Sequence, residues 1–325
     1  ALQSASQLDT IIVDKTGTVT EGKPRLTKCI PVNGFKKSEA IALAAALESR
    51  SEHPLGKAII SAAKERDIEV QSVSEFKAIA GFGVEAQLNG QHLYIGNSRL
   101  MQKLKVETTS VTQALIELSK RGETPVLLAA DQKLVALIGI SDPVRADSSS
   151  AIKRLLSLGL NVIMLTGDNH QTAKAVAHSV GIDDVIADVL PQDKAKKVSA
   201  LQQQGHKVAM VGDGINDAPA LAKSNVGIAI GSGTDIAIES ADIALMRNSL
   251  HGVADAITLS RATLGNIKQN LFGAFIYNIL GIPIAAGALY PFFGVLLSPI
   301  IAATAMSLSS FTVVSNALRL KRIKF

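Results

Sequence analysis

Cysteine and tryptophan are the residues that this sequence of 325 amino acids most clearly lacks: it has one cysteine and no tryptophan. The single Cys29 excludes an intrachain disulfide and suits a reducing compartment. Aromatic residues amount to only 4% of the chain, and no basic stripe carries interleaved aromatics, so nucleic-acid binding is not indicated. Because the sequence starts at Ala1 with neither an initiator methionine nor a signal peptide, we expect part of a longer protein.

Charge is missing from one long segment near the end of the chain. Residues 269–318 contain no Asp, Glu, Lys or Arg, whereas the preceding residues read as ordinary globular sequence. Two apolar stretches within this segment, at about 271–290 and 295–318, are each long enough to cross roughly 30 Å of hydrocarbon as a helix. The alternative, a buried hairpin of a soluble protein, fits poorly with so long an uncharged run. We therefore predict two transmembrane helices.

The flanks of this segment predict its orientation. The short PFFG sequence at 291–294 would join the two helices as a hairpin, and Lys268 precedes the first of them. Since basic residues favour the cytosolic side, both outer ends of the hairpin should face the cytosol. The basic residues that follow the second helix are Arg319, Lys321, Arg322 and Lys324.

Three short apolar runs each lead into a loop rich in Asp, Gly and Thr. They lie at 10–13 before DKTGT, at 161–165 before TGDN, and at 207–211 before GDGINDAP. Uninterrupted β-branched runs of this length suit buried parallel strands, and helical patterns between them predict a doubly wound α/β sheet. Loops after such strands meet at one edge of the sheet. The residues expected there are Asp14, Thr166, Asp168, Asp213 and Asp217; the helices are expected at 148–157, 171–180 and 194–204.

A long segment separates the first strand from the other two, and it has helices and strands of its own. An Asn89-Gly90 pair predicts a hairpin turn between two of its strands. We therefore predict a second domain inserted into the first, with the divisions at 1–28 plus 138–264, 29–137 and 265–325. The elements expected in the insert are helices at 54–66 and 111–120 and strands at 84–88, 93–95, 126–130 and 134–140.

DKTGT carries the most informative chemistry. Asp14, at the end of a strand and on a glycine-containing turn, can act as a carboxylate nucleophile toward a phosphoryl group, although an Asp there could also be a simple turn former. Haloacid dehalogenase-class phosphatases place a second Asp two residues later, as an acid and base for hydrolysis. Thr16 occupies that position here and cannot act as a general base at neutral pH. The sequence therefore favours forming an acyl phosphate and delaying its hydrolysis.

The other two loops supply groups that would handle the phosphoryl charge. Oxygen ligands from Asp14 and Asp213 suit Mg²⁺, while Asn216 and Asp217 would orient the phosphate and its surroundings. The Thr166 hydroxyl and the Gly167 amide can donate hydrogen bonds to phosphate oxygens. Lys194 can direct an ammonium group toward the same charge, although alone it would read as a solvated helix lysine.

DKTGT, TGDN and GDGINDAP, in this order, resemble the signature motifs of the P-type ATPases from about Leu8 to the C-terminus. The resemblance implies a haloacid dehalogenase-like phosphorylation domain, an inserted α+β nucleotide-binding domain, and two following transmembrane helices. It implies that ATP phosphorylates Asp14, and that Mg²⁺ is held by Asp14, the Thr16 carbonyl and Asp213.

The insert resembles that of the heavy-metal-transporting branch, through SEHPLGKAI at 51–59. This resemblance implies that Glu48 and His53 contact adenine. His53-Pro54 also fits a plain helix start, and both interpretations can hold together. The motifs GFG and IGN complete the implied nucleotide pocket, with glycines where a side chain would collide with a ligand. Their residues are Gly81, Gly83, Gly96 and Asn97.

The hairpin resembles the copper(I) members of that branch, whose metal path is lined by Tyr, Asn, Met and Ser. A thioether suits Cu(I) and Ag(I), and the absence of a charged residue argues against a divalent ion. Helix packing is the alternative for these residues. The candidate copper ligands are Tyr277, Asn278, Met306 and Ser310.

The resemblance also implies segments that we expect before Ala1: an actuator domain with TGE, a membrane helix with Cys-Pro-Cys, and a metal-binding domain. ATP, copper(I), membrane lipid and a copper chaperone are the implied partners, in a multi-pass membrane protein with cytoplasmic soluble domains. Three alternatives remain open: a membrane-anchored haloacid dehalogenase-type phosphohydrolase, a pump for silver(I) or another heavy metal, and a non-enzymatic regulator that binds ATP or copper.

Overall fold

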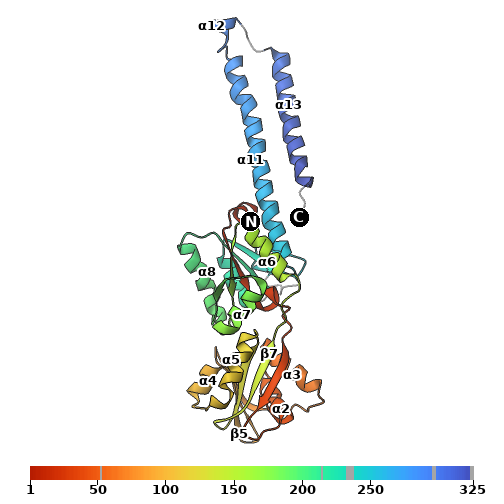
Figure 1. The fold of residues 1–325 in the computed structure, drawn as a ribbon. Coiled ribbons are helices and arrows are strands. Elements are labelled where there is room, and N and C mark those ends of the chain that lie inside the picture. The colour runs from red at the N-terminus through yellow and green to blue at the C-terminus, as the bar shows by residue number, and fades with distance from the viewer. Residues whose placement is uncertain (52, 214, 232–237, 295–297, 323–325) are drawn as a thin grey trace. The chain divides into compact units, whose positions relative to one another are not determined.

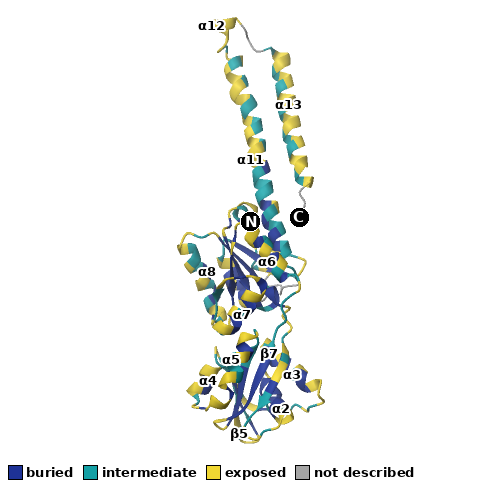
Figure 2. Cartoon of the chain, in the orientation of Figure 1, coloured by how far each residue is buried: buried dark blue, intermediate teal, exposed yellow. Residues whose placement is uncertain are grey.

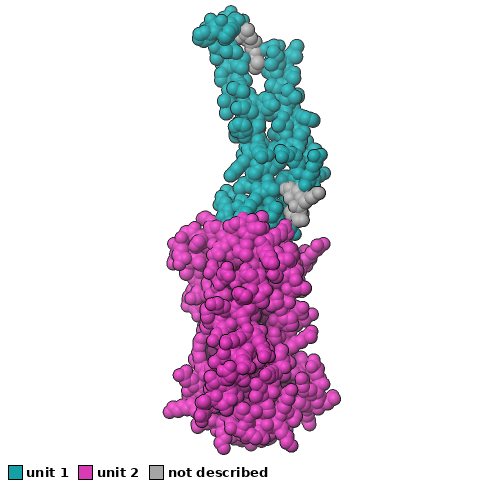
Figure 3. Space-filling model, in the orientation of Figure 1, with its two compact units in different colours: residues 1–8, 252–325 teal, residues 9–251 magenta. Residues whose placement is uncertain are grey.

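A computed structural model describes the chain except for residues 52, 214, 232–237, 295–297 and 323–325. The chain divides into two compact units, which Figure 3 shows in different colours. One unit comprises residues 9–251 and holds both β-sheets. The other comprises residues 1–8 and 252–325 and consists of helices.

The first sheet has six parallel strands in the order β12-β11-β10-β1-β8-β9. The three predicted strands are confirmed: β8 has the predicted bounds, and the ends of β1 and β10 differ from prediction by one residue at most. Every residue of β1, β10 and β11 is buried, as expected for strands covered on both faces. The strands are β1 (Thr10–Asp14), β8 (Asn161–Leu165), β9 (Asp184–Ile186), β10 (Val208–Gly212), β11 (Val226–Ile230) and β12 (Ile243–Leu245).

The predicted helices between these strands are also present. The Asn169 side chain accepts a hydrogen bond from the Thr172 amide at the start of α7, and Gly181 ends that helix in the left-handed conformation. Beneath α8 and α9 the buried residues Ile12, Leu165 and Met210 form part of a core shared with the central strands. The helices are α6 (Ser148–Ser157), α7 (His170–Val180), α8 (Lys194–Gln203) and α9 (Ala218–Lys223).

The second sheet is antiparallel, with the order β2-β7-β6-β5-β4-β3, and is built from a continuous part of the chain between β1 and α6. The four predicted strands correspond to β4, β5, β6 and β7, and β2 and β3 were not predicted. The strands are β2 (Arg25–Pro31), β3 (Ser74–Ile79), β4 (Gly83–Leu88), β5 (Gln91–Gly96), β6 (Thr124–Ala130) and β7 (Lys133–Ser141).

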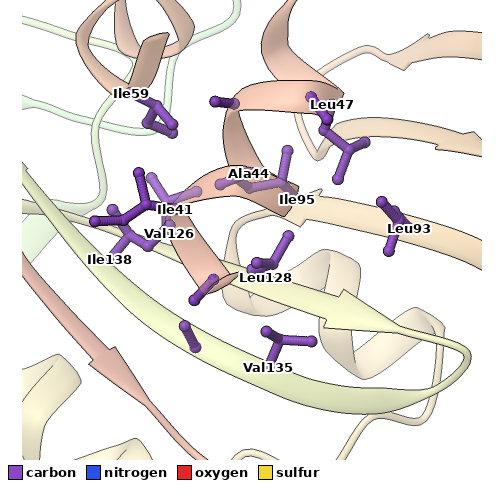
Figure 4. Close-up of a cluster of buried hydrophobic side chains, with 14 of the residues drawn as sticks. Ile41, Ala44, Leu47, Ile59, Leu93, Ile95, Val126, Leu128, Val135 and Ile138 are labelled. Atoms are coloured by element: carbon purple, nitrogen blue, oxygen red, sulfur yellow. The ribbon is translucent and has the colours of Figure 1, made fainter. Parts of the chain in front are cut away.

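Helices cover both faces of this second sheet. Figure 4 shows one face, where Ile41, Ala44 and Leu47 of α2 lie over Ile95 and Leu128 of the strands. On the other face α4 and α5 pack with Leu100, Met101 and Leu118 against a separate buried cluster. Both predicted helices are present as α3 and α5, whereas α2 and α4 were not predicted. The helices are α2 (Lys37–Glu48), α3 (Pro54–Lys64), α4 (Ser98–Lys103) and α5 (Thr112–Lys120).

The helical unit contains two long helices, α11 (His251–Ala285) and α13 (Pro299–Leu318), which run side by side in Figure 1. The short helices α1 (Leu2–Ser6) and α12 (Tyr290–Phe293) belong to the same unit. Figure 2 shows that α13 and the distal part of α11 are exposed or half-buried. The exposed residues include large apolar ones such as Phe272 and Phe311. Such exposed apolar surface is unusual for a helix in water.

The expectation of two membrane spans is met only in part. Among the described residues one helical segment, Pro299–Arg322, is long and apolar enough to cross a membrane. The predicted span at 271–290 is not confirmed. Because α11 ends at Ala285, only about 15 residues of the predicted span lie in this helix, where about 20 are needed. The predicted start at 295 and the terminal Lys324 lie outside the described residues.

Candidate active site

Three loops meet at the carboxyl edge of the first sheet. β1 lies between β10 and β8, and all three are parallel, so the residues after each strand emerge at the same edge. Asp14, Asp213 and Asp217 come together there, with carboxylate oxygens within 4.8 Å of one another. The sequence predicted that these carboxylates lie close together, and the structure confirms this arrangement.

The turn after β1 is shaped around these carboxylates. The Thr16 amide donates a hydrogen bond of 3.0 Å to Asp14 Oδ2, which fixes the carboxylate at the end of the strand. Gly17 has φ +74°, and a Cβ at that position would lie 1.7 Å from Asp213 Oδ2. Only glycine fits this turn, because any side chain would displace Asp213.

Lys194 lies at the centre of the cluster. Its Nζ donates to Asp14 Oδ1 at 2.6 Å and to Asp217 Oδ1 at 2.7 Å, and its side chain is 9% exposed. It is the first residue of α8, so the helix backbone places its amine toward the sheet edge. The interpretation of Lys194 as a solvated helix lysine is wrong, because the side chain is buried against two carboxylates.

Burial sets the protonation of this cluster. Burial and the neighbouring Asp217 charge raise the pKa of Asp14 to about 7, although Lys194 lowers it. Burial and Asp217 likewise raise the pKa of Asp213 to about 6. Burial alone would lower the pKa of Lys194, but the Asp14 and Asp217 charges raise it above its ordinary value. The ammonium therefore stays charged, while the carboxylates resist ionising together.

These residues fit a divalent cation. Hard oxygen ligands from one or two carboxylates are what Mg²⁺ uses in proteins. The pKa values of Asp14 and Asp213 are raised in part by carboxylate repulsion that a dication would relieve. The Thr16 carbonyl and the Asp213 carboxylate, with Asp14, are the groups that would hold it.

The loop after β8 forms the neighbouring part of the site. Thr166 is buried, and its Oγ1 accepts a hydrogen bond of 3.1 Å from the Asp168 amide, while Gly167 is exposed. Asp168 forms an ion pair with Lys15 and accepts a hydrogen bond from Thr124 at the start of β6. Asp168 therefore joins the turn after β1 to the start of β6 in the second sheet.

Asn216 differs from the other predicted residues of this edge. It lies in the turn η4 (Ile215–Asp217) and is exposed, while its neighbour Asp217 is buried. The exposed amide leaves Asn216 open to a ligand, and its predicted role toward the phosphate stays a prediction.

The nucleotide-binding candidates lie in the second-sheet region. His53 begins α3: its Nδ1 accepts a hydrogen bond of 3.2 Å from the Leu55 amide, and Pro54 is the first helical residue. The helix-start interpretation is thus confirmed, and it leaves Nε2 free to carry the proton. Glu48 is buried, and its Oε2 has no hydrogen-bond partner among the described residues. Burial raises the pKa of Glu48, so a donor brought by a ligand would stabilise it.

The predicted glycines have structural explanations of their own. A Cβ at Gly83 would lie 2.0 Å from the Ile95 carbonyl oxygen, and one at Gly96 would lie 2.1 Å from that of Phe82. These two glycines therefore allow β4 and β5 to pair closely. Gly81 has φ +76° and accepts a hydrogen bond of 2.8 Å from Asn97 Nδ2. Whether a nucleotide also uses these positions stays a prediction.

The four copper candidates are not joined by contacts. Asn278 is exposed, and its Nδ2 donates to the Ala274 carbonyl of its own helix. Met306 is 71% exposed, Ser310 is exposed, and Tyr277 is half-buried. In this hairpin the residues lie along two helices without forming a ligand shell.

Sequence reasoning missed two residues that support the turn after β1. Arg145 Nη2 donates to the Gly17 carbonyl at 2.9 Å, and Asp142 Oδ2 accepts from Thr20 Oγ1 at 2.6 Å. Both belong to the SDPVR sequence that follows β7. A charged pair around a proline, directly after an apolar strand, was the available signal. Gly56 was also missed: a Cβ there would lie 2.3 Å from Glu48 Oε2.

Comparison with known proteins first defines the class. The family description "haloacid dehalogenase-like hydrolase" matches residues 8–225, which include the three loops at the carboxyl edge of the first sheet and the inserted sheet. The chain belongs to the haloacid dehalogenase-like hydrolases.

Closer relatives define the branch. The chain is 31% identical to a structure titled as the catalytic domain of the CPx-ATPase CopB-B, covering 90% of that domain with a TM-score of 0.63. It is 38% identical to a zinc-transporting PIB-type ATPase structure in the E2.Pi state, with a TM-score of 0.67, covering 98% of this chain and 51% of that one. A copper-exporting P-type ATPase of Legionella pneumophila is 50% identical over 99% of this chain. The chain is therefore a member of the heavy-metal P-type ATPases, and it spans 44% of the length of that Legionella relative.

Proposed function

We propose that this chain is the catalytic and C-terminal membrane part of an ATP-driven copper(I)-exporting ATPase. In this assignment residues 1–28 and 138–264 form the phosphorylation domain, 29–137 the nucleotide-binding domain, and 265–325 a membrane hairpin. The observation that carries the proposal is Asp14, held at a strand end by the Thr16 amide and bridged through Lys194 to Asp217. The names of its relatives support copper as the cargo.

The proposed reaction transfers the terminal phosphoryl group of ATP to Asp14. A carboxylate oxygen of Asp14 attacks the γ-phosphorus, the new O–P bond forms, and the bond from that phosphorus to the bridging oxygen breaks to release ADP. Lys194 and the hydrogen-bond donors of Thr166 and Gly167 stabilise the charge on the phosphoryl oxygens. Bound Mg²⁺ would neutralise phosphate charge during the transfer. Asp213, Asp217 and Asn216 complete the surroundings of the phosphoryl group.

Thr16 distinguishes this proposal from a phosphohydrolase of the same class. Its side chain is half-buried beside the nucleophile and offers a hydroxyl where a general base would be needed for rapid hydrolysis. The acyl phosphate should therefore survive until another part of the transporter directs water to it. A pump requires such a delay to couple phosphorylation with ion movement. In a phosphohydrolase the intermediate would break down directly, and little label would accumulate.

We expect His53→Gln to weaken ATP binding to this chain by about 1–3 kcal/mol, the size of one polar contact to a buried ligand. The Gln side chain cannot reproduce the ring that faces adenine in the proposed pocket. Titration calorimetry with a non-hydrolysable ATP analogue measures the affinity. His92→Gln is the matched control, because His92 is an exposed histidine on β5 of the second sheet. An affinity unchanged by His53→Gln would leave this histidine with its helix-start role alone.

The hairpin would provide part of the copper path. We propose that α11 and α13 both enter the membrane, in a multi-pass protein whose soluble domains face the cytoplasm. Tyr277, Asn278, Met306 and Ser310 offer uncharged oxygen and thioether groups, and a thioether suits Cu(I) better than Zn²⁺. Further ligands, including the Cys-Pro-Cys of another helix, would come from the rest of a longer protein, together with an actuator domain. A copper chaperone is a further proposed partner.

In a full-length transporter that contains this chain, Met306→Ala should abolish the stimulation of ATP hydrolysis by buffered free Cu(I). Asn278→Ala should have the same effect, while both variants keep nucleotide binding because the soluble domains fold around their own cores. Leu308→Ala, on the same helix as Met306, is the control. Zn²⁺ and Ag(I) are tested beside Cu(I). Stimulation by Zn²⁺, or an intact Cu(I) response in both variants, would contradict the assignment of a soft metal.

A further inference from the structure

Three asparagines form a closed hydrogen-bonded group between α11 and α13. Asn270 Nδ2 donates to Asn266 Oδ1 at 3.1 Å, and Asn316 Nδ2 donates to Asn270 Oδ1 at 2.9 Å. Asn266 Nδ2 donates to the backbone carbonyl oxygen of Asn316 at 2.7 Å, in the last turn of α13. Arg319 Nη1 donates to the remaining Asn316 side-chain oxygen at 3.2 Å. We call Asn266, Asn270 and Asn316 the asparagine clamp.

Breaking the clamp would cost free energy, because a buried amide would be left without a hydrogen-bond partner. Asn266 is 8% exposed, and both of its side-chain polar atoms are satisfied by the other two asparagines. Sliding the helices past each other would break the two hydrogen bonds that join Asn316 to α11, and the buried Asn266 amide would lose its partner on α13. Within the described part of the hairpin, four further polar side chains of α11 and α13 form hydrogen bonds, each within its own helix. They are Asn278, Thr304, Ser307 and Thr312.

The clamp also defines how the two antiparallel helices are aligned. One further point of alignment lies deeper in the hairpin, where a Cβ built on Gly273 would be 4.0 Å from Thr312 Cγ2. Gly273 lies three residues after Asn270 on α11, and Thr312 lies four residues before Asn316 on α13. These two positions therefore lie opposite each other. The amide contacts and this contact specify the same register.

That register places two of the proposed copper ligands at one depth. Met306 lies ten residues before Asn316, about 15 Å along a helix with a rise of 1.5 Å per residue. Asn316 contacts both Asn266 and Asn270 on α11. Asn278 lies twelve residues after the first and eight after the second, which is about 18 Å and about 12 Å along the helix. The mean, about 15 Å, equals the distance from Asn316 to Met306 on α13. A slip of one helical turn would separate the two by about 5 Å, too far for a shared metal ligand shell.

We propose that the asparagine clamp is the register lock of this hairpin, which positions Met306 and Asn278 at the same depth. This inference concerns three residues outside the ligand set, and its consequence for copper rests on the proposed function. Asn266, Asn270 and Asn316 act as positioning residues, through the helices that carry the ligands.

Cysteine cross-linking of this chain in lipid vesicles tests the register without copper. In a Cys29→Ser background, the pair Gly273→Cys and Thr312→Cys reports the native alignment, and Gly273→Cys with Leu308→Cys reports a one-turn slip. With the clamp intact, the native pair should cross-link and the displaced pair should not. Replacing all three asparagines with Leu removes the two hydrogen bonds that join α11 to α13. This loss should lower the cross-linking yield of the native pair about tenfold and raise the yield of the displaced pair.

Controls keep this result specific. Thr304→Val removes a hydrogen bond within α13 and should leave both yields unchanged. If the triple variant does not insert, Asn270→Ala removes two bonds of the clamp and should shift the yields in the same direction by a smaller factor. A cross-linking pattern that either inserted variant leaves unchanged would overturn the register lock, whether or not the protein handles copper.

The second measurement links the register to the metal. In a full-length transporter, Asn270→Ala should raise the Cu(I) concentration for half-maximal ATPase stimulation, while phosphorylation by ATP at saturating Cu(I) is retained. A shifted cross-linking pattern with no copper-stimulated activity in the parent protein would contradict the proposed function and leave the register lock standing. A shifted pattern with an unchanged Cu(I) response would overturn the positioning role.

Discussion

Asp14→Asn should remove all acid-stable phosphate label from this chain. Incubation with γ-labelled ATP and Mg²⁺, followed by acid quenching, should label the parent protein and leave the variant at background, since an amide oxygen is not a competent nucleophile. Asp9→Asn is the matched control: Asp9 precedes the same strand at its opposite end, where it accepts a hydrogen bond from the Lys207 amide. Label that persists in Asp14→Asn would show that another residue is the phosphoryl acceptor.

The same variant should remain folded, and its stability provides a pH test. The folded pKa of Asp14, about 7, lies above the unfolded value of about 3.9. Ionising this group therefore costs stability as the pH rises through that window, and Asn removes the cost. Without Mg²⁺, the unfolding temperature of Asp14→Asn relative to the parent should rise between pH 4 and pH 7. A difference that shrinks over this range would mean that Lys194 outweighs burial at Asp14.

Lys194→Ala should have the second largest effect. It leaves Asp14 and Asp217 buried beside each other without the cation that bridges them. We expect phosphorylation to slow by about 10²–10³-fold, the range for the loss of one group that stabilises transition-state charge. We also expect a loss of about 3–5 kcal/mol in the free energy of unfolding, as for other buried pairs that lose one partner. Rapid-quench labelling and urea unfolding measure the two effects.

Lys196→Ala is the control for this experiment. Lys196 lies on the same helix, but it is exposed and pairs with Asp193 at the surface, where an ion pair contributes little. It should therefore change neither the rate nor the stability measurably. If Lys194→Ala phosphorylates at the parent rate, the lysine serves only to neutralise the carboxylates in the resting protein.

The first sheet could be predicted from sequence because its signals are local. Each strand is a short buried run that ends in a polar loop, and parallel strands place those loops at one edge. Lys194 could be placed at this edge only in combination with the other loops. Its pattern is that of an exposed helix lysine, and its burial depends on how α8 packs against β10 and α9.

Elsewhere the local signals were weaker. β2 has mostly exposed or half-buried side chains, so it lacks the apolar run by which a central strand is recognised. The helix α2 is apolar around much of its circumference and carries little periodic signal. The end of α11 at Ala285 could not be predicted either, because the uncharged composition continues through the turn that follows it. Arg145 acts through a backbone carbonyl, which no side-chain pattern reveals.

The strand order of the first sheet has a consequence for how the protein folds. Both strands that pair with β1, β8 and β10, lie about 150 and 200 residues later in the chain. The second sheet, by contrast, takes all its strands from one continuous stretch that is complete before β8 is synthesised. During translation the inserted sheet should therefore fold first, while β1 and its nucleophile wait unpaired. Within the first sheet, the strand that ends in Asp14 therefore precedes both of its partner strands in the chain and pairs with them late.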